Sequence, residues 1–212
     1  MIISLTGFMG CGKSSVGRRL SELLCCPFMD LDDVIVESAG RSIPEIFATE
    51  GEPSFRQMEL EALKQIITPS VMSQCAPLAP SHLVDPSPYA GVRKCQFRTS
   101  VSSPEDSMHR GNNTTPNLVL ALGGGAVMTR ECAEIVREET CCVYLKASIE
   151  TLVEHLSGEA EGRPMLHGNS MKERIAELMT QRNETYEKTA HIIIDTDGMT
   201  IEAIASKIKS LV

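Results

Sequence analysis

The sequence predicts an α/β fold in which a five-stranded parallel sheet carries helices on both faces. Short apolar runs alternate with amphipathic segments along most of the chain, and a glycine-rich loop joins the first run to the first amphipathic segment. Polar motifs follow several of the other apolar runs. Strands that alternate with helices form parallel sheets, and these sheets bind ligands at the carboxyl ends of their strands. We therefore expect the 212 residues to form a single domain, 1–212, with its functional groups at one edge of a sheet.

The first loop, GFMGCGKSS, lies between the apolar run MIISLT and the helical pattern VGRRLSELL. Gly7, Gly12, Lys13 and Ser14 fit the phosphate-binding pattern G-x-x-x-x-G-K-[ST]. In such a loop the backbone N–H groups surround a polyphosphate, the lysine reaches the β- and γ-phosphates, and the serine hydroxyl binds Mg²⁺. The start of the following helix adds its positive end to the same site. The predicted nucleotide-binding residues are Gly10, Cys11, Gly12, Lys13, Ser14 and Ser15.

A second short strand, 27–29, ends at an acidic segment that contains Asp30, Asp32 and Asp33. Paired carboxylates at a strand exit can serve a magnesium ion through water, or accept a proton from a substrate hydroxyl. Asp30 and Asp32 are candidates for these tasks. The alternative, that an acid merely caps the next helix, is the interpretation that we assign to Asp33.

Three helices are expected next. The first runs through 33–38 and closes at Gly40, and the second begins at a capping box formed by Ser42 and Glu45. The third extends from about Pro53 to Ile67 and places Arg56 near its start.

The segment 69–116 holds seven of the eleven prolines and loses apolar periodicity. Such a composition cannot bury enough apolar surface to offset its ordering entropy, so we predict a largely mobile, exposed insertion. A passive surface excursion is the simpler interpretation. A docking or regulatory segment is the alternative, and its natural contacts would be Tyr89, Arg93, Lys94 and Phe97.

Strands and helices then alternate to the end of the chain. We expect a strand at 118–122 that runs into three glycines, a helix from about 129 and a strand at 141–147. A helix capped by Ser148 then ends near Leu156, and a glycine-rich loop follows at 157–170. The last elements are a helix from a second capping box (Ser170 and Glu173) to about Lys188, a strand at 191–195, and a final helix that carries Ile201, Ile204, Ile208 and Leu211.

Three arginines stand near these strand exits. Arg56 and Arg182 could clamp a substrate carboxylate through paired hydrogen bonds if they converge, although each alone is also consistent with a solvated surface charge. Arg163 lies in the glycine-rich loop 157–170, which we interpret as a lid that delivers an arginine to a transferring phosphoryl group. An ordinary flexible loop is the alternative.

Bulk properties exclude several classes of function. The formal net charge of -8 argues against a nucleic-acid partner, which would need clustered Lys and Arg. Apolar runs are all shorter than the roughly 20 residues of a membrane span, and no secretory leader precedes the first strand. We therefore expect a cytoplasmic protein without a membrane partner, whose eight cysteines stay reduced.

Six segments in order resemble the shikimate kinase family, which has a nucleoside-monophosphate-kinase-like phosphate-loop fold. The match covers nearly all of the chain outside the insertion. The segments are GFMGCGKSSVG, FMDLD, GRSIPEIFATEGEPSFRQMELEAL, LALGGGAV, RPML and RNETYEKTA. The resemblance makes 32–67 the substrate-binding region and 157–170 the lid.

The resemblance implies a role for each matching residue. Lys13 would contact the phosphates of ATP, while Ser14 and Asp30 would hold Mg²⁺, with Asp30 acting through water. Asp32 would bind the shikimate hydroxyls and act as base for the one that is phosphorylated, and Arg163 would stabilise charge during transfer. The substrate-binding residues implied are Asp32, Arg56, Gly124, Gly125 and Arg182. Glycines in the triple-glycine segment would let backbone donors approach a small polar ring.

The implied activity is transfer of the γ-phosphoryl group of ATP to the 3-hydroxyl of shikimate by a monomeric kinase of chorismate biosynthesis. Two alternatives remain at this stage: a gluconate-type kinase of small hydroxy acids, and a non-catalytic relative that binds ligand. Two departures from the family pattern stand out, namely the insertion and the missing counterpart of an adenine-stacking arginine. His155 lies nearby and is left unassigned.

Overall fold

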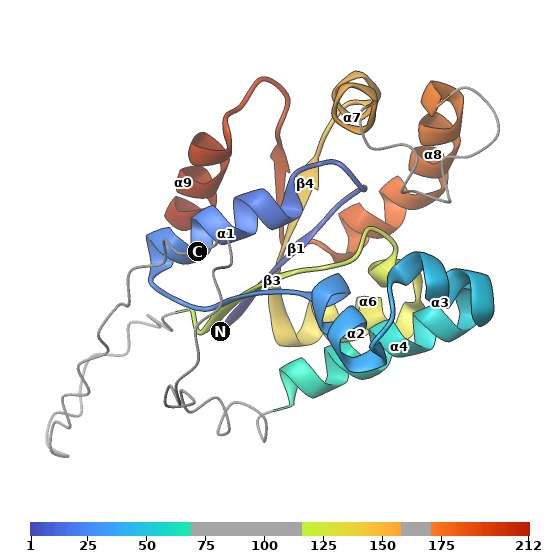
Figure 1. Cartoon of the computed structure of the whole chain (residues 1–212). Coiled ribbons are helices and arrows are strands. Elements are labelled where there is room, and N and C mark those ends of the chain that lie inside the picture. Colours follow the sequence, from blue (N-terminus) through green and yellow to red (C-terminus); the bar gives the residue numbers. More distant parts are fainter. Residues whose placement is uncertain (69–115, 158–170) are drawn as a thin grey trace, which may run out of the picture.

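The computed structural model describes residues 1–68, 116–157 and 171–212, and these form one five-stranded parallel sheet with helices on both faces (Figure 1). The strand order is β2-β3-β1-β4-β5, so the first strand of the chain occupies the centre. The strands are β1 (Ile2–Thr6), β2 (Phe28–Asp30), β3 (Leu118–Ala121), β4 (Thr140–Lys146) and β5 (Ile192–Asp195). This arrangement confirms the predicted fold class.

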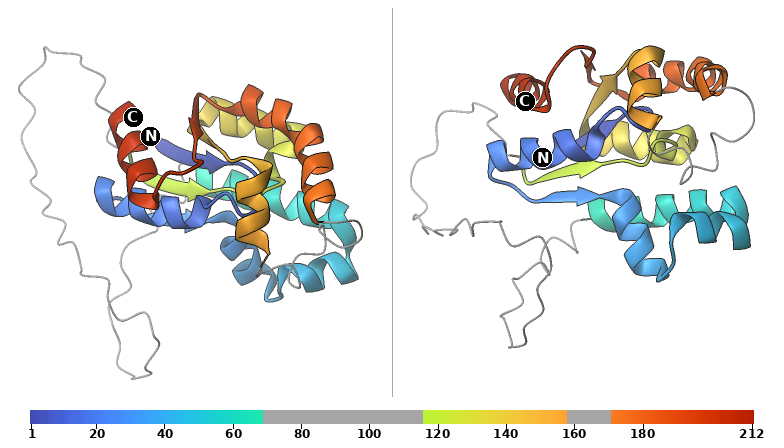
Figure 2. Two further views of the ribbon diagram at one scale, coloured as in Figure 1. Left: turned by 90° about the horizontal axis from the view of Figure 1, so that it is seen from above. Right: turned by 45° about the horizontal axis from the view of Figure 1, so that its top comes forward.

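Helices cover the sheet in two layers (Figure 2). Helix α1 packs on α9 and on β3, whereas α6 packs on β4 and α4 from the other side. The helical elements are α1 (Lys13–Leu24), α2 (Leu31–Ala39), α3 (Ile43–Thr49), α4 (Gly51–Ile67), the 3₁₀ turn η1 (Ala126–Met128), α6 (Arg130–Glu139), α7 (Ile149–Leu156), α8 (Met171–Thr189) and α9 (Ile201–Leu211).

The central strands are buried on both faces because successive side chains point to opposite layers. Ile3 and Leu5 join the apolar cluster under α1 and α9, while Ile2 joins the cluster under α2, α4 and α6. The same alternation separates Val143 from Tyr144 in β4. Two apolar cores therefore hold the sheet rigidly between the helix layers, and the strand exits have fixed positions.

Local capping follows the sequence at two of the predicted positions. The Glu45 carboxylate accepts hydrogen bonds from the backbone N–H and the hydroxyl of Ser42, at 2.8 and 2.6 Å, as expected for a capping box at α3. The Ser148 hydroxyl accepts a hydrogen bond from the N–H of Thr151 at the start of α7.

Two helix starts differ from the prediction. Asp33 was expected to cap α2, but the helix begins earlier, at Leu31, and Asp30 is its cap: the Asp30 carboxylate accepts from the N–H of Asp32 at 3.1 Å. Asp33 lies inside the first turn, where an acid favours the helix dipole instead. Helix α4 begins at Gly51 and not at Pro53, because proline is tolerated in a first helical turn.

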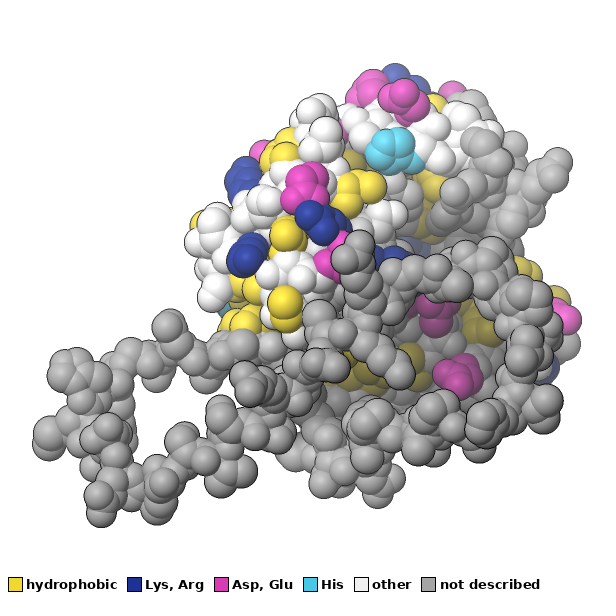
Figure 3. Space-filling model, turned by 60° about the vertical axis from the view of Figure 1, so that its left-hand side comes forward, with side chains coloured by type: hydrophobic (Ala, Val, Ile, Leu, Met, Phe, Trp, Pro, Cys, Tyr) yellow, Lys and Arg dark blue, Asp and Glu magenta, His cyan; other side chains and the backbone are white. Residues whose placement is uncertain are grey.

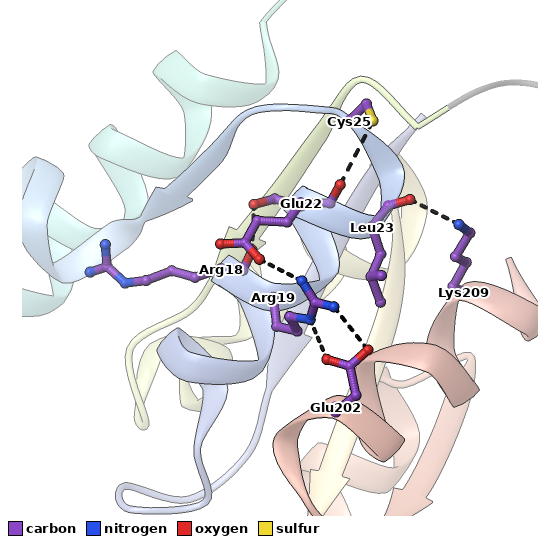
Figure 4. Close-up of polar contacts among 8 residues, drawn as sticks. Arg18, Arg19, Glu22, Leu23, Cys25, Glu202 and Lys209 are labelled. Atoms are coloured by element: carbon purple, nitrogen blue, oxygen red, sulfur yellow. Dashed lines mark hydrogen bonds and ion pairs between the residues drawn. The ribbon is translucent and has the colours of Figure 1, made fainter. Parts of the chain in front are cut away.

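Polar contacts join α9 to α1 along their exposed edges (Figure 4). The Arg19 guanidinium binds Glu22 of its own helix and also both carboxylate oxygens of Glu202 at the start of α9. Lys209 donates to the carbonyl of Leu23 at 2.9 Å. The described cysteines are free thiols.

Both attachment points of the predicted insertion lie at the amino-terminal edge of the sheet. Thr68 ends α4, and the N–H of Asn117, just before β3, donates to the carbonyl of Met1, just before β1. Most of the predicted insertion 69–116, most of the predicted lid 157–170, and Ser170 of the second capping box lie outside the described residues.

Acidic and basic side chains are interspersed over the described part of the face in Figure 3. None of the described helices is long and apolar enough to cross a membrane.

Candidate active site

The loop between β1 and α1 has the backbone shape of a phosphate cradle. Gly7, Gly10 and Gly12 have φ angles of 144°, 80° and 88°, in the region that disfavours side chains. A Cβ atom on Gly7 would lie 2.7 Å from the carbonyl oxygen of Leu145, so only glycine fits against β4. Helix α1 begins at Lys13 directly after Gly12, which offers no side-chain cap, and the N–H groups of its first turn therefore face the loop.

The Lys13 ammonium lies within this loop. It donates to the carbonyls of Gly7 and Phe8, both at 3.0 Å, and the Cys11 sulfur is 4.0 Å away. An ammonium fixed by two backbone carbonyls sits close to the N–H groups that would surround a phosphate. The predicted nucleotide-binding residues thus form one continuous cradle.

Ser14 and Asp30 are brought together across α1 and β2. The Ser14 hydroxyl donates to Oδ2 of Asp30 at 2.6 Å, while Oδ1 of Asp30 caps α2. A hydroxyl and a carboxylate are hard oxygen ligands that suit Mg²⁺. No group of three or more His, Cys, Asp or Glu side chains in the described part of the chain could hold a metal. A magnesium ion here would therefore depend largely on water and phosphate oxygens.

The carboxyl groups of Asp32, which is half-buried, and Glu59, which is buried, both approach Gly123. A Cβ atom on Gly123 would lie 2.6 Å from Oδ1 of Asp32 and 2.7 Å from Oε1 of Glu59. Both of these oxygens are buried and have no hydrogen-bond partner among the described residues. Burial and the nearby Asp30 raise the pKa of Asp32, against the opposing charges of Lys13 and Arg56. Burial also raises the pKa of Glu59, to about 7, although the neighbouring Arg56 opposes the shift.

Arg56 is held by acids on its own helix. Its guanidinium donates to Glu59 at 2.5 Å and to Glu52 at 2.8 Å, so it bridges one buried carboxylate and one exposed carboxylate. A Cβ atom on Gly125 would lie 2.5 Å from the Arg56 guanidinium, so the third glycine of the triplet makes room for this charge. Arg56 is therefore an oriented group beside the glycine triplet and not a solvated surface charge.

Arg182 and Tyr186 lie one turn apart on α8 and approach the same region. Arg182 is 7% exposed and stands over the ring of Phe8, next to the phosphate loop. The Tyr186 hydroxyl donates to the carbonyl of Gly124, and its ring stacks on Tyr144. Burial raises the pKa of Tyr186 to about 12, against the charges of both Arg182 and Arg56. Arg56 therefore lies against Gly125, and Arg182 is one helical turn from the residue that contacts Gly124, while their predicted convergence on a carboxylate stays a prediction.

A cavity of about 810 Å³ joins the phosphate loop to Asp32, while Arg56 and Arg182 are not among the residues that line it. Its walls include the phosphate loop, Asp30, Asp32 and Gly124, together with Thr151, His155, Thr196, Met199, Thr200 and Ile201. The volume lies within the range of small-molecule sites. It extends from the phosphate loop to Asp32 without interruption, as transfer between two bound ligands requires.

Several of these groups were absent from the sequence prediction. Glu59 lies in the segment GRSIPEIFATEGEPSFRQMELEAL, but no role was assigned to it from the sequence. Its position three residues after Arg56, on the same helix face, was the signal that could have indicated a partner for that arginine. His155 was noted and left unassigned. Thr151, Thr196, Met199, Thr200 and Ile201 gave no sequence signal because they match no motif and only the fold brings them to the cavity. Arg163, predicted as the lid arginine, lies outside the described residues.

Comparisons with known proteins agree with this geometry. The family model for shikimate kinase matches residues 9–76 and 103–212. The shikimate kinase of Geobacter sulfurreducens is 34% identical over 99% of this chain and 90% of that protein. The shikimate kinase of Zymomonas mobilis is 35% identical over 87% of this chain and 78% of that protein.

Solved structures show the same likeness. The shikimate kinase of Acinetobacter baumannii in complex with shikimate has a TM-score of 0.74 and 28% identity, over 99% of this chain and 91% of that chain. The shikimate kinase of Aquifex aeolicus has a TM-score of 0.65 and 25% identity, over 100% of this chain and 96% of that chain. Since the family model matches most of the chain and full-length relatives exceed 30% identity, the chain belongs to the shikimate kinase family.

Proposed function

We propose that this kinase transfers the γ-phosphoryl group of ATP to the 3-hydroxyl of shikimate, giving shikimate 3-phosphate and ADP in the pathway to chorismate and the aromatic amino acids. One observation supports the proposal most directly. Asp32, whose carboxylate has a buried oxygen without a partner among the described residues, lines the same cavity as Lys13, and the neighbouring Gly125 lies against the oriented guanidinium of Arg56.

In this proposal, arginine side chains bind the carboxylate of the acceptor, and an aspartate carboxylate binds one of its hydroxyls. We assign the shikimate carboxylate to Arg56 and Arg182, with the backbone of Gly124 and Gly125 against the ring. Guanidinium groups bind carboxylates through paired hydrogen bonds, which fixes orientation as well as position. The unpartnered Oδ1 of Asp32 would accept a hydrogen bond from a ring hydroxyl.

Asp32 is also our candidate for the base that receives the proton of the attacking hydroxyl. Its raised pKa makes its carboxylate a stronger base than an exposed aspartate, closer to the working pH of a general base. Phosphoryl transfer depends mainly on positioning and charge stabilisation, so the base needs only to orient the nucleophile and accept its proton.

The donor side holds the phosphates and stabilises developing charge. We assign the phosphates to Gly10, Cys11, Gly12, Lys13, Ser14 and Ser15 of the loop. Magnesium would be held by Ser14 and, through water, by Asp30, and when bound it neutralises phosphate charge. We assign Arg163 the stabilisation of charge on the transferring group, from a lid at 157–170.

The same proposal covers organisation and setting. We propose a monomeric, cytoplasmic enzyme with one domain, 1–212, in which 32–67 form the substrate-binding region and 69–116 an insertion. No nucleic-acid or membrane partner is proposed, in keeping with the net charge of -8.

A substrate panel tests the proposal. ADP release would be measured with ATP and Mg²⁺ against shikimate, quinate, gluconate and nucleoside monophosphates, with Lys13→Met as the blank. We expect selective turnover of shikimate. Preference for gluconate would replace the proposal with the related hydroxy-acid kinase, and ATP binding without turnover of any acceptor would indicate a non-catalytic relative.

A further inference from the structure

Helix α7 lies across the carboxyl end of the sheet, above the turn between β1 and α1 (Figures 1 and 2). Its last turn contacts the phosphate loop at one residue. The His155 ring nitrogen Nδ1 is 2.8 Å from the carbonyl oxygen of Gly10. Because a carbonyl can only accept, Nδ1 must carry the hydrogen in this contact. Leu156 is fully buried beside the same residue, and a Cβ atom on Gly10 would lie 2.9 Å from its side chain.

The hydrogen bond fixes one peptide plane of the loop from both sides. The carbonyl of Gly10 accepts from His155, and the N–H of Cys11, in the same peptide unit, donates to the carbonyl of Phe8 at 3.3 Å. A planar peptide held at its oxygen and its nitrogen cannot rotate about the chain. The next two N–H groups, those of Gly12 and Lys13, follow directly from this unit and belong to the phosphate cradle.

The first turn of α7 is tied to the segment between β5 and α9. Asp197, between β5 and α9, accepts from the N–H of Ser148 at 3.0 Å and from the Thr151 hydroxyl at 2.8 Å. Thr151 and His155 are four residues apart, so they lie on the same helix face, and both line the cavity. Helix α7 therefore connects residues 196–201 to the phosphate loop through hydrogen bonds at each of its ends.

We propose that His155 is a positioning residue for the nucleotide, and this inference rests on the proposed function. By holding the Gly10 carbonyl, His155 keeps the following N–H groups oriented toward the phosphates. Its effect should fall on ATP and not on the acceptor, because Asp32, Arg56 and Arg182 hold the acceptor on other elements.

The test compares His155→Ala, His155→Asn and the exposed neighbour Glu154→Ala as the matched control. The Asn amide can donate to the same carbonyl, whereas Ala cannot. We expect His155→Ala to raise the KM for ATP about 3- to 10-fold, in keeping with the loss of one hydrogen bond. The KM for shikimate and the thermal midpoint should stay within about 2-fold and about 2 °C of wild type. His155→Asn should recover most of the ATP affinity.

Two results would overturn the inference: an unchanged KM for ATP in His155→Ala, or the same loss in His155→Ala and His155→Asn. Direct titration of each variant with ATP, without acceptor, separates this inference from the proposed function. If the wild-type protein binds ATP but does not phosphorylate shikimate, the proposed acceptor is wrong while the His155 comparison still gives an answer.

Discussion

The proposed donor and acceptor sides of the site are built differently. On the donor side, residues Gly7 to Ser14 form the cradle almost alone, and the polar groups of Lys13, Ser14 and Asp30 have partners within the protein. On the acceptor side, Asp32, Arg56, Gly125 and Arg182 come from distant segments, and buried oxygens of Asp32 and Glu59 lack partners among the described residues. A local motif thus determines the donor side, whereas the packing of several helices determines the acceptor side.

The comparison has an energetic consequence. A preorganised cradle needs little rearrangement when it stabilises developing charge, which suits the transition state. Buried oxygens without partners cost free energy in the folded protein, and a bound hydroxyl that donates to them removes this cost. We therefore expect substitutions in the phosphate cradle to change kcat most. Substitutions on the acceptor side, apart from Asp32 as the proposed base, should change the KM for shikimate and the stability.

Lys13→Met should cause the largest loss, lowering kcat by about 100-fold or more because charge on the transferring phosphoryl group loses its ammonium partner. Single-turnover kinetics with saturating ATP and shikimate would measure it. A kcat near that of the wild type would break the comparison, because the donor side would then contribute binding alone.

Arg56→Ala should raise the KM for shikimate by about 30- to 1000-fold, equivalent to about 2–4 kcal/mol, with a smaller change in the KM for ATP. Steady-state kinetics with each substrate varied would measure the split. Arg130→Ala removes an exposed helical arginine and serves as the control. An unchanged KM for shikimate would place the carboxylate site elsewhere.

The sequence could predict the glycine-rich turn and the start of α1 because the spacing within one local segment specifies their shape. It also predicted every strand, since apolar runs bounded by turns and helices are a local signal. The acceptor side was only partly predictable. Arg56 and Arg182 were named, but their separation along the sequence does not tell how far apart α4 and α8 lie in the folded protein. The cap at Asp30 was missed because three acids stand at or just after the end of β2 and only the backbone geometry distinguishes them. Glu59 was missed because its burial depends on how α4 packs beside η1.

Glu59→Gln should remove a pH dependence of stability that belongs to the acceptor side. The folded-state pKa of Glu59 is about 7 and its ordinary value is 4.5, so the folded protein binds the extra proton between these values. In this window the contribution of Glu59 to the free energy of unfolding falls as pH rises. It is fully present below pH 4.5 and lost above pH 7, in total about 3 kcal/mol.

Urea unfolding of wild type and Glu59→Gln between pH 4 and about 8 would measure the contribution of Glu59 as the difference between the two free energies of unfolding. The variant should gain stability relative to wild type as pH rises through the window. Glu52→Gln, which removes the exposed partner of Arg56, should run parallel to wild type. Parallel curves for Glu59→Gln as well would mean that Glu59 has the same pKa in the folded and the unfolded protein.

Arg19→Ala should have the smallest effect. Its ion pairs with Glu22 and Glu202 are exposed, and such pairs are screened by solvent and salt. We expect a slight fall in thermal midpoint at low salt that disappears at high salt, and unchanged kinetics with both substrates. A rise in the KM for ATP would show that ATP binding also depends on the contact between α1 and α9, so that the donor side extends beyond the phosphate loop.

The attachment points of residues 69–116 bear on how such a chain can change length. Arg56 and Ile67 are eleven residues apart on α4, or about 16 Å along the helix axis, so Thr68 and Asn117 leave the sheet at the edge opposite the chemistry. Additional residues at this junction leave the spacing of the proposed catalytic groups unchanged. The length of the chain there can therefore change during evolution without loss of activity. The same junction is a place where a reporter domain could be fused to the enzyme, whereas an equal addition between β1 and α1 would separate the phosphates from their cradle.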